Sequence, residues 1–305
     1  MSDFNITFRG VRGSFPVANK NFYQYGGNTS CVEIKAGDKL IILDAGTGII
    51  ATGDEMVDKY ITSAIDNEKR IPLKATVLLS HIHQDHIMGL TFFKPLHIKT
   101  SKITVLGNTG TDKTLAQELE TLVFGKTFPI DLNDIECELN ITDLTKNNKI
   151  VISDECVAKL YPMDFEPKED DVVIEYFKSY VHPQHGVMIY KITYKNKSVV
   201  YATDKECYMG GDKKFSKFAK DCDVLIHDAQ YTTEDYLNPA FPKQGFGHST
   251  YDMAVEIKKL TNAKNMIFFH YDPGYDDVKL NRIKEHYVTD SNNTFMAYEG
   301  LVFDI

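Results

Sequence analysis

Residues 81–86 read His81-Ile82-His83-Gln84-Asp85-His86 and directly follow the apolar run Ala75-Thr76-Val77-Leu78-Leu79-Ser80. Four of these six residues carry an imidazole or a carboxylate that can bind a transition metal. The chain has 10 histidines, and three of them fall within these six positions, which argues against chance clustering on a solvated loop. A single tetrahedral ion rarely needs four ligands this close together. The pattern therefore predicts two neighbouring metal ions at the carboxyl end of a strand.

The bulk composition is that of an ordinary soluble globular protein, with 305 residues of which 43% are hydrophobic and 25% are charged. The N-terminus has no basic segment followed by an apolar run, so we expect no signal peptide. No stretch approaches the roughly 20 apolar residues that cross a bilayer. The five cysteines are scattered, which argues against a disulfide framework. We therefore expect a cytoplasmic protein without membrane contact.

Periodicity predicts strands and helices in both halves of the chain. Strands are expected at 4–8, 31–34, 40–43, 75–79, 103–106, 172–181, 187–194, 198–202, 224–226, 266–269 and 295–303. Amphipathic helices are expected at 55–68, 113–124, 251–260 and 278–286. Both halves run from strands into helices, which favours an α/β (α+β) fold with two inner sheets and outer helices, an αββα four-layer sandwich.

The domain organisation follows from the absence of a linker. No stretch rich in Pro, Gly or Ser divides the chain, so we expect a single domain over residues 1–305. Residues 108–171 are the least regular part. A segment of this length between core strands predicts a lid or an interface insertion.

Further potential ligands follow later apolar strands, in the same position as the first cluster: His182, Asp204 and His270. Asp44 ends an earlier strand, and its carboxylate could orient a metal-binding imidazole through the second ring nitrogen. The glycine-containing segments 9–14 and 26–30 either form tight turns or bring backbone amides close to an anion.

Taken together, Asp44-Ala45-Gly46-Thr47-Gly48, the cluster at 81–86 and the later His, Asp and His resemble the metallo-β-lactamase fold superfamily along nearly the whole chain. The resemblance implies these ligands: His81, His83 and His182 for the first ion, Asp85, His86 and His270 for the second, and Asp204 as a bridge. His185 competes with His182, but the His-Pro setting of His182 resembles that of the phosphodiesterase branch. Nitrogen and oxygen ligands favour zinc, with Mn or Fe as alternatives.

Three local features resemble the branch that contains phosphodiesterases and tRNA 3′-processing nucleases. His83 stands where diiron oxygen-reducing members have Glu. The surroundings of His182 differ from the Gly-His-Thr motif of lactamases and thioester hydrolases. The segment Gly247-His248-Ser249-Thr250 resembles the extra histidine of the nucleases, and Asp228 matches its acidic partner. Alternatively, His248 only belongs to the turn before helix 251–260, which Ser249 or Thr250 can cap.

The resemblance implies a metal-dependent phosphoric diester hydrolase. A metal-bridged hydroxide would attack phosphorus beside Asp85, and His248, kept protonated by Asp228, would stabilise or protonate the leaving oxygen. The chain lacks the Gly/Lys-rich arm with which the tRNA-processing nucleases grip tRNA, and its net charge is -9. An acidic balance opposes binding of a polyanion.

We therefore expect the substrate to be a small phosphodiester, such as a cyclic nucleotide, and the assembly to be a homodimer. Nucleic acid is a less favoured partner. Two alternatives remain at this point: an RNA 3′-end endonuclease of the tRNA-processing type, and a sensor that binds iron without hydrolysis.

Overall fold

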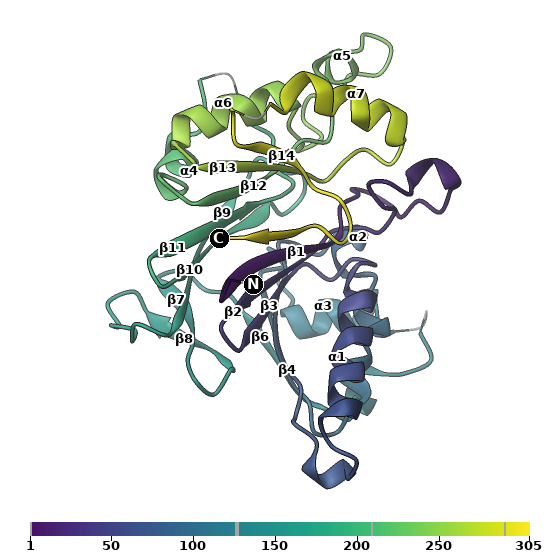
Figure 1. Cartoon of the computed structure of the whole chain (residues 1–305), viewed down its shortest axis with the longest axis vertical. Coiled ribbons are helices and arrows are strands. Elements are labelled where there is room, and N and C mark those ends of the chain that lie inside the picture. Colours follow the sequence, from purple (N-terminus) through teal and green to yellow (C-terminus); the bar gives the residue numbers. More distant parts are fainter. Residues whose placement is uncertain (1, 126–127, 209, 290) are drawn as a thin grey trace.

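Two mixed β-sheets lie face to face in the computed structural model, which describes residues 2–125, 128–208, 210–289 and 291–305 (Figure 1). The first sheet has the strand order β15 (Val302–Asp304), β1 (Phe4–Gly10), β2 (Cys31–Ala36), β3 (Lys39–Leu43), β4 (Lys74–Leu78), β5 (Lys102–Gly107) and β6 (Glu138–Asp143). The second has the order β14 (Thr294–Met296), β13 (Asn265–Phe269), β12 (Val224–Asp228), β11 (Lys197–Ala202), β10 (Val187–Tyr194), β9 (Val172–Ser179), β7 (Asn148–Ile152) and β8 (Ala158–Pro162).

Helices cover the outer faces of both sheets and complete the four layers. Helices α1 (Ile49–Ser63) and α3 (Leu115–Leu122) lie outside the first sheet, and α6 (Tyr251–Thr261) and α7 (Asp277–Tyr287) lie outside the second (Figure 1). The shorter helices are α2 (Gln84–Ile87), α4 (Lys213–Phe218) and α5 (Thr233–Tyr236), with 3-10 turns at Lys20–Phe22, Asn67–Lys69, Leu90–Phe92, Lys94–His97 and Leu132–Asp134. The αββα sandwich predicted from the sequence is confirmed.

Strand direction places the functional residues at one edge of each sheet. In the first sheet β3, β4 and β5 run parallel, and in the second β11, β12 and β13 do the same. Parallel neighbours end at the same edge, where open α/β sheets bind their ligands. The polar residues that follow these strands therefore gather on one side of the molecule.

Side chains between the sheets form one continuous apolar core. Phe4, Ile6 and Phe8 of β1 are buried in it, and so are Ile189 and Tyr201 from the second sheet. The inward side chains of β1 alternate with period two, as expected for a strand with one face in the core. Neither sheet could bury its apolar face alone. The single domain over residues 1–305 stays a prediction.

The C-terminal strand prediction, at 295–303, was wrong as a single strand. The chain forms β14 in the second sheet, turns at Gly300 with a φ of 85°, and forms β15 in the first sheet. A continuous apolar run cannot reveal such a crossing, because both short strands are rich in the same residue types. The crossing ties the two sheets together next to β1.

Residues 108–171 are more regular than their sequence suggested, since they contain β6, β7 and β8. The strands β6 and β8 are the edge strands of the two sheets, where polar side chains are tolerated and the alternating pattern is weak, whereas β7 lies between β9 and β8 and is mostly buried. Their role as a lid or an interface stays a prediction. The predicted helix 55–68 begins earlier, at Ile49, and ends at Ser63. Among the described residues, no helix combines the length and the apolar character needed to cross a bilayer.

The shared core gives a direct test of the sandwich. Ile189→Ala should lower the free energy of unfolding by about 2–5 kcal/mol, because it opens a cavity where both sheets meet. Ile65→Ala removes the same side chain from an exposed position and should change it by less than about 0.5 kcal/mol. Urea unfolding followed by circular dichroism measures both changes. Equal effects of the two substitutions would contradict the assigned core.

Candidate metal centre

The predicted metal ligands converge from both sheets at the edge where the parallel strands end. Their ligand atoms form overlapping groups within 4.8 Å: His81, His83 and His182; His81, His86 and Asp204; Asp85, His86 and His270. All seven predicted ligands belong to these groups, and all except the half-buried His83 are buried. We propose that these groups hold two ions, a proposal supported by the distances between their ligand atoms.

The first group surrounds the Nε2 atom of His81. His182 Nε2 lies 3.1 Å from His83 Nδ1 and 3.6 Å from Asp204 Oδ1. His81 Nε2 lies 3.7 Å from the same Asp204 oxygen, is buried, and has no hydrogen-bond partner among the described residues. A buried polar atom without a partner costs free energy. A metal ion at this point would satisfy that nitrogen.

The second group is tighter. His86 Nε2 lies 3.2 Å from Asp85 Oδ2, and His270 Nε2 lies 3.3 Å from the same oxygen. Asp204 Oδ2 is 3.2 Å from His86 Nε2 and 3.3 Å from His270 Nε2. Asp204 thus directs one carboxylate oxygen to each group, as expected of a ligand that bridges two ions. Imidazole nitrogens with carboxylate oxygens suit zinc or a similar divalent ion.

His182 and His185 occupy different environments. His182 is buried within the first group, whereas His185 is exposed and outside all of these groups. Gln184, between the two histidines, has a φ of 64°, so the chain turns before it reaches His185. This geometry favours His182 as the ligand, in agreement with the sequence-based preference.

The carboxylate of Asp44 orients His86 from behind. Asp44 Oδ2 lies 2.8 Å from His86 Nδ1. The same oxygen accepts hydrogen bonds from the hydroxyls of Ser80 and Tyr201, each at 2.8 Å. A proton held on Nδ1 leaves Nε2 to face the centre. Asp44 therefore occupies the orienting position expected from the sequence, while its partners Ser80 and Tyr201 had not been predicted.

Two further groups behind the ligands were missed by sequence reasoning. Gln230 Oε1 lies 3.1 Å from His270 Nδ1, and the Gly247 carbonyl oxygen lies 3.3 Å from His182 Nδ1. Both acceptors favour the tautomer that presents Nε2 to the centre. Gln230 follows the end of β12 by two residues, which is a usable sequence signal. A backbone carbonyl gives no signal at all.

The glycine-containing segment 9–14 acts on a ligand. The backbone N–H of Ser14 donates a hydrogen bond of 2.7 Å to Asp85 Oδ2. A Cβ atom at Gly13 would lie 2.4 Å from the ring of His270, so only glycine fits at this position. Of the two sequence interpretations, a backbone amide near an anion describes this segment, and the anion is a protein carboxylate.

Backbone strain is concentrated at the strand ends that form the centre. The left-handed φ region is disfavoured for residues with a Cβ, and it persists only where the surroundings enforce it. Three site residues adopt it: Asp44 at 63°, Asp204 at 51° and His270 at 66°. Each follows a strand end, and the conformation turns the side chain towards the centre.

The electrostatics of the centre suit cation binding. Burial holds the pKa of His81 well below its ordinary value and lowers the pKa of His182 to about 4, so both rings are neutral. Burial raises the pKa of Asp85 and Asp204, but neighbouring imidazoles, chiefly those of His86 and His270, outweigh it and hold both pKa values well below the usual range. Neutral imidazoles and ionised carboxylates are the forms that bind metals. His86 differs, because burial lowers its pKa but Asp85, Asp204 and Asp44 outweigh burial and raise the pKa well above its ordinary value. A metal ion would therefore have to displace a proton from this ring.

His248 and Asp228 form a buried pair beside the ligands. His248 Nδ1 lies 2.8 Å from Asp228 Oδ2, and the His248 ring stacks on His270 with 5.1 Å between centroids. Burial lowers the pKa of His248, but Asp228 and then Asp204 outweigh it and raise the pKa to about 8. Thr250 caps α6, so the cap does not use His248.

His248 could also be a metal ligand. One of its ring nitrogens lies within 4.8 Å of potential ligand atoms of Asp204, Asp228 and His270. The structure thus brings the pair together as expected and leaves two interpretations, proton donor or additional ligand.

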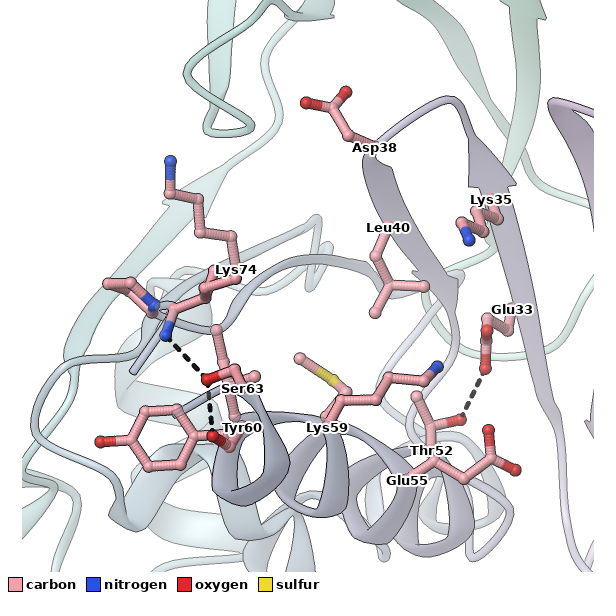
Figure 2. A pocket seen from close by; sticks show the side chains of 14 residues that line it. Glu33, Lys35, Asp38, Leu40, Thr52, Glu55, Lys59, Tyr60, Ser63 and Lys74 are labelled. Carbon is pink, nitrogen blue, oxygen red and sulfur yellow. Dashed lines mark hydrogen bonds between the residues drawn. The ribbon is translucent and has the colours of Figure 1, made fainter. Parts of the chain in front are cut away.

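A hollow at the opposite end of the first sheet is separate from this centre. It is lined by residues from β2, β3 and α1, and Figure 2 shows charged side chains of both signs around it, among them Glu33, Lys59 and Lys74. Lys74 begins β4, whereas His81 follows the end of that strand. None of the predicted ligands lines this hollow, so we assign the chemistry to the centre between the sheets.

Two mixed sheets with a buried centre of imidazoles and carboxylates define a metal-dependent hydrolase of the αββα type. The chain belongs to the beta-lactamase superfamily, because the family described as "Beta-lactamase superfamily domain" matches residues 39–271. This range contains all the predicted ligands.

Similarity extends over the whole chain to proteins named Ribonuclease Z. The one from Picrophilus torridus is 25% identical over 333 residues, covering 100% of this chain and 96% of the relative. Among solved structures, the metallo-beta-lactamase fold protein YhfI from Bacillus subtilis has a TM-score of 0.65 at 18% identity and covers 98% of both chains. The short form of human tRNase Z has a TM-score of 0.59 at 15% identity and covers 99% of both. These structural likenesses confirm the fold.

Metal content tests the ligand assignment. Asp85→Ala or His86→Ala should each reduce about two bound ions per chain to about one and abolish hydrolysis, because both residues belong to the second group. Elemental analysis after dialysis measures the content, and circular dichroism checks folding. The control His185→Ala removes an exposed imidazole and should keep the full content. Retention of both ions and full turnover by Asp85→Ala would refute the two-ion assignment.

Proposed function

We propose that the protein is a phosphodiester hydrolase that cleaves RNA near a 3′ end, in the manner of the tRNA-processing nucleases. The observation that carries this proposal is the pairing of His248 with Asp228 directly beside the predicted ligands. The full-length similarity to several relatives named Ribonuclease Z supports it. We propose zinc as the resident metal, since the donors are imidazole and carboxylate.

The chain's own residues can be given definite tasks. Bound divalent ions would supply Lewis acidity and an activated water at neutral pH. Asp204 fixes the spacing of the two groups, because each of its carboxylate oxygens faces one of them. Asp228 accepts hydrogen bonds from the backbone amides of Ser249, at 2.8 Å, and Asp204, at 3.1 Å, which hold its carboxylate in place beside His248.

His248 is the proton donor in this proposal. Its pKa of about 8 keeps the imidazole protonated at neutral pH. Its Nδ1 atom lies 3.9 Å from Asp204 Oδ1, at the rim of the first group. A cation at this point stabilises the charge that develops on the leaving oxygen and can deliver a proton to it.

This proposal replaces the small cyclic phosphodiester that the acidic composition favoured. The relatives support the alternative, RNA, better than a cyclic nucleotide. The homodimer stays a prediction.

The substrate class is tested by comparing the substrates that the two hypotheses favour. The zinc-loaded protein should cleave a precursor RNA with a 3′ extension at a higher kcat/KM than any cyclic nucleotide. Because several phosphates would be contacted, RNA binding should weaken by orders of magnitude between low and moderate salt. A higher kcat/KM for a cyclic nucleotide, with little salt dependence, would restore the original preference. An iron-replete, coloured protein inert to both substrates would instead indicate the sensor.

The role of His248 is tested by the choice of leaving group. His248→Ala should retain both ions and lose about 10²–10⁴-fold in kcat on RNA, the usual contribution of a positioned acid. The loss should be smaller on bis(p-nitrophenyl) phosphate, because p-nitrophenolate leaves without a proton. Asp228→Asn should show a milder version of the same pattern. Loss of an ion from His248→Ala would make His248 a ligand, and a uniform loss on both substrates would indicate phosphate binding alone.

A further inference from the structure

A hollow of about 710 Å³ lies next to the metal centre on the side of His83. It is formed by the loop after β5, the turn between β6 and β7, strand β9, and the loop before β10. Gln184 lines the hollow, and its Oε1 atom lies 3.4 Å from His83 Nε2. A ligand that occupies the hollow would therefore border directly on the predicted ligands.

The hollow is basic although the chain is acidic. Lys146, Lys178 and Lys214 line it, together with His185, and no Asp or Glu is among its lining residues. Within the described parts of the chain, no carboxylate lies within 4.0 Å of these three ammonium groups, whereas many other lysines are paired. Three unneutralised lysines around one concavity attract an anion, even in a protein with a net charge of -9.

Aromatic side chains stand beside the lysines. Tyr176, Phe177 and Tyr180 line the same hollow, and Tyr180 is 74% exposed. The Lys214 ammonium lies 4.4 Å from the centroid of Phe177, and the Lys178 ammonium lies 5.8 Å from that of Tyr180. Tyr176 and Phe177 are half-buried, so Tyr180 is the ring most open to a ligand. An exposed ring with adjacent cations is the combination on which a base of single-stranded nucleic acid stacks while its phosphate is neutralised.

The segments around the hollow are held together by specific contacts. Lys178 Nζ donates a hydrogen bond of 2.7 Å to Asn108 Oδ1. The side-chain Nδ2 of Asn108 donates a hydrogen bond of 3.1 Å to the Leu144 carbonyl. The Tyr176 hydroxyl donates to the Thr145 carbonyl at 2.9 Å. A Cβ at Gly110 would lie 2.4 Å from Lys178 Nζ, so this loop packs closely against β9. Such a hollow is preformed for a ligand.

We propose that this hollow binds a nucleotide of the RNA substrate next to the cleaved phosphodiester, with its base on Tyr180 and its phosphate near Lys214 and Lys178. The proposal rests on the proposed function, because the adjoining centre would cleave the same strand. A nucleotide fits better than another anion, because the hollow offers both rings and cations and adjoins the predicted ligands through the contact of Gln184 with His83.

The test combines two exposed positions, so that folding is preserved. The double variant Tyr180→Ala/Lys214→Ala is compared with Tyr23→Ala/Lys217→Ala, which removes the same groups from exposed positions outside the hollow, Lys217 from the same helix α4. The measured quantity is the ratio of kcat/KM for the precursor RNA to kcat/KM for bis(p-nitrophenyl) phosphate. We expect this ratio to fall about 10-fold or more, mainly through KM, in the first variant and to stay within about twofold in the second.

The outcomes separate this proposal from the proposed function. Suppose that the wild type cleaves RNA and that both double variants keep the wild-type ratio of the two kcat/KM values, or lower it equally. The hollow is then not a nucleotide site, while the proposed nuclease function is retained. If the wild type cleaves no RNA, the proposed function fails. Calorimetric titration of the zinc-loaded protein with adenosine and uridine monophosphate then decides: binding lost only in Tyr180→Ala/Lys214→Ala supports the site, and equal or absent binding overturns it.

Discussion

Four aspartate carboxylates, those of Asp44, Asp85, Asp204 and Asp228, are buried at one edge of the sandwich, and neutralising their charge is the constraint on which the centre depends. Isolated charges in a dry interior are too costly to persist. Imidazoles lie close to each carboxylate, backbone amides donate to those of Asp44, Asp85 and Asp228, and the strained strand ends hold these groups in place. The same crowding of negative charge creates the strong demand for cations that a two-ion centre requires. Packing, strain and proposed chemistry thus have one common cause.

The layers could be predicted from the sequence, and so could the gathering of the candidate ligands at one edge, because both depend on local patterns. A ligand such as His81 or His270 stands directly after an apolar strand, and parallel strands bring such ends together. Contacts between distant segments could not be predicted in the same way. The Ser14 amide meets Asp85 across 71 positions, and no local pattern encodes that pairing. The edge strands β6 and β8 were hidden for another reason: few of their residues are buried, so polar residues obscure the alternation.

The net charge and the named relatives favour different substrate classes, and this disagreement has a physical reason. The value of -9 counts the buried aspartates of the centre without the cations that they would hold. It also averages over a surface on which one hollow is lined by three lysines and by no carboxylate. The field that a ligand meets is set by nearby groups, since charges beyond about 10 Å are largely screened at moderate salt. Local charge around the centre therefore carries more information about the partner than the total.

The crossing at Gly300 has a consequence for biosynthesis. Because β15 pairs with β1, the edge of the first sheet is completed only after residue 302 has left the ribosome, nearly 300 residues after its partner. His270, from β13, also arrives late, long after the cluster at 81–86. Pairings between segments so far apart in sequence form slowly. During translation the nascent chain would therefore carry most of its metal-binding side chains without the enclosed centre, and hydrolytic activity would appear as one of the last events of folding.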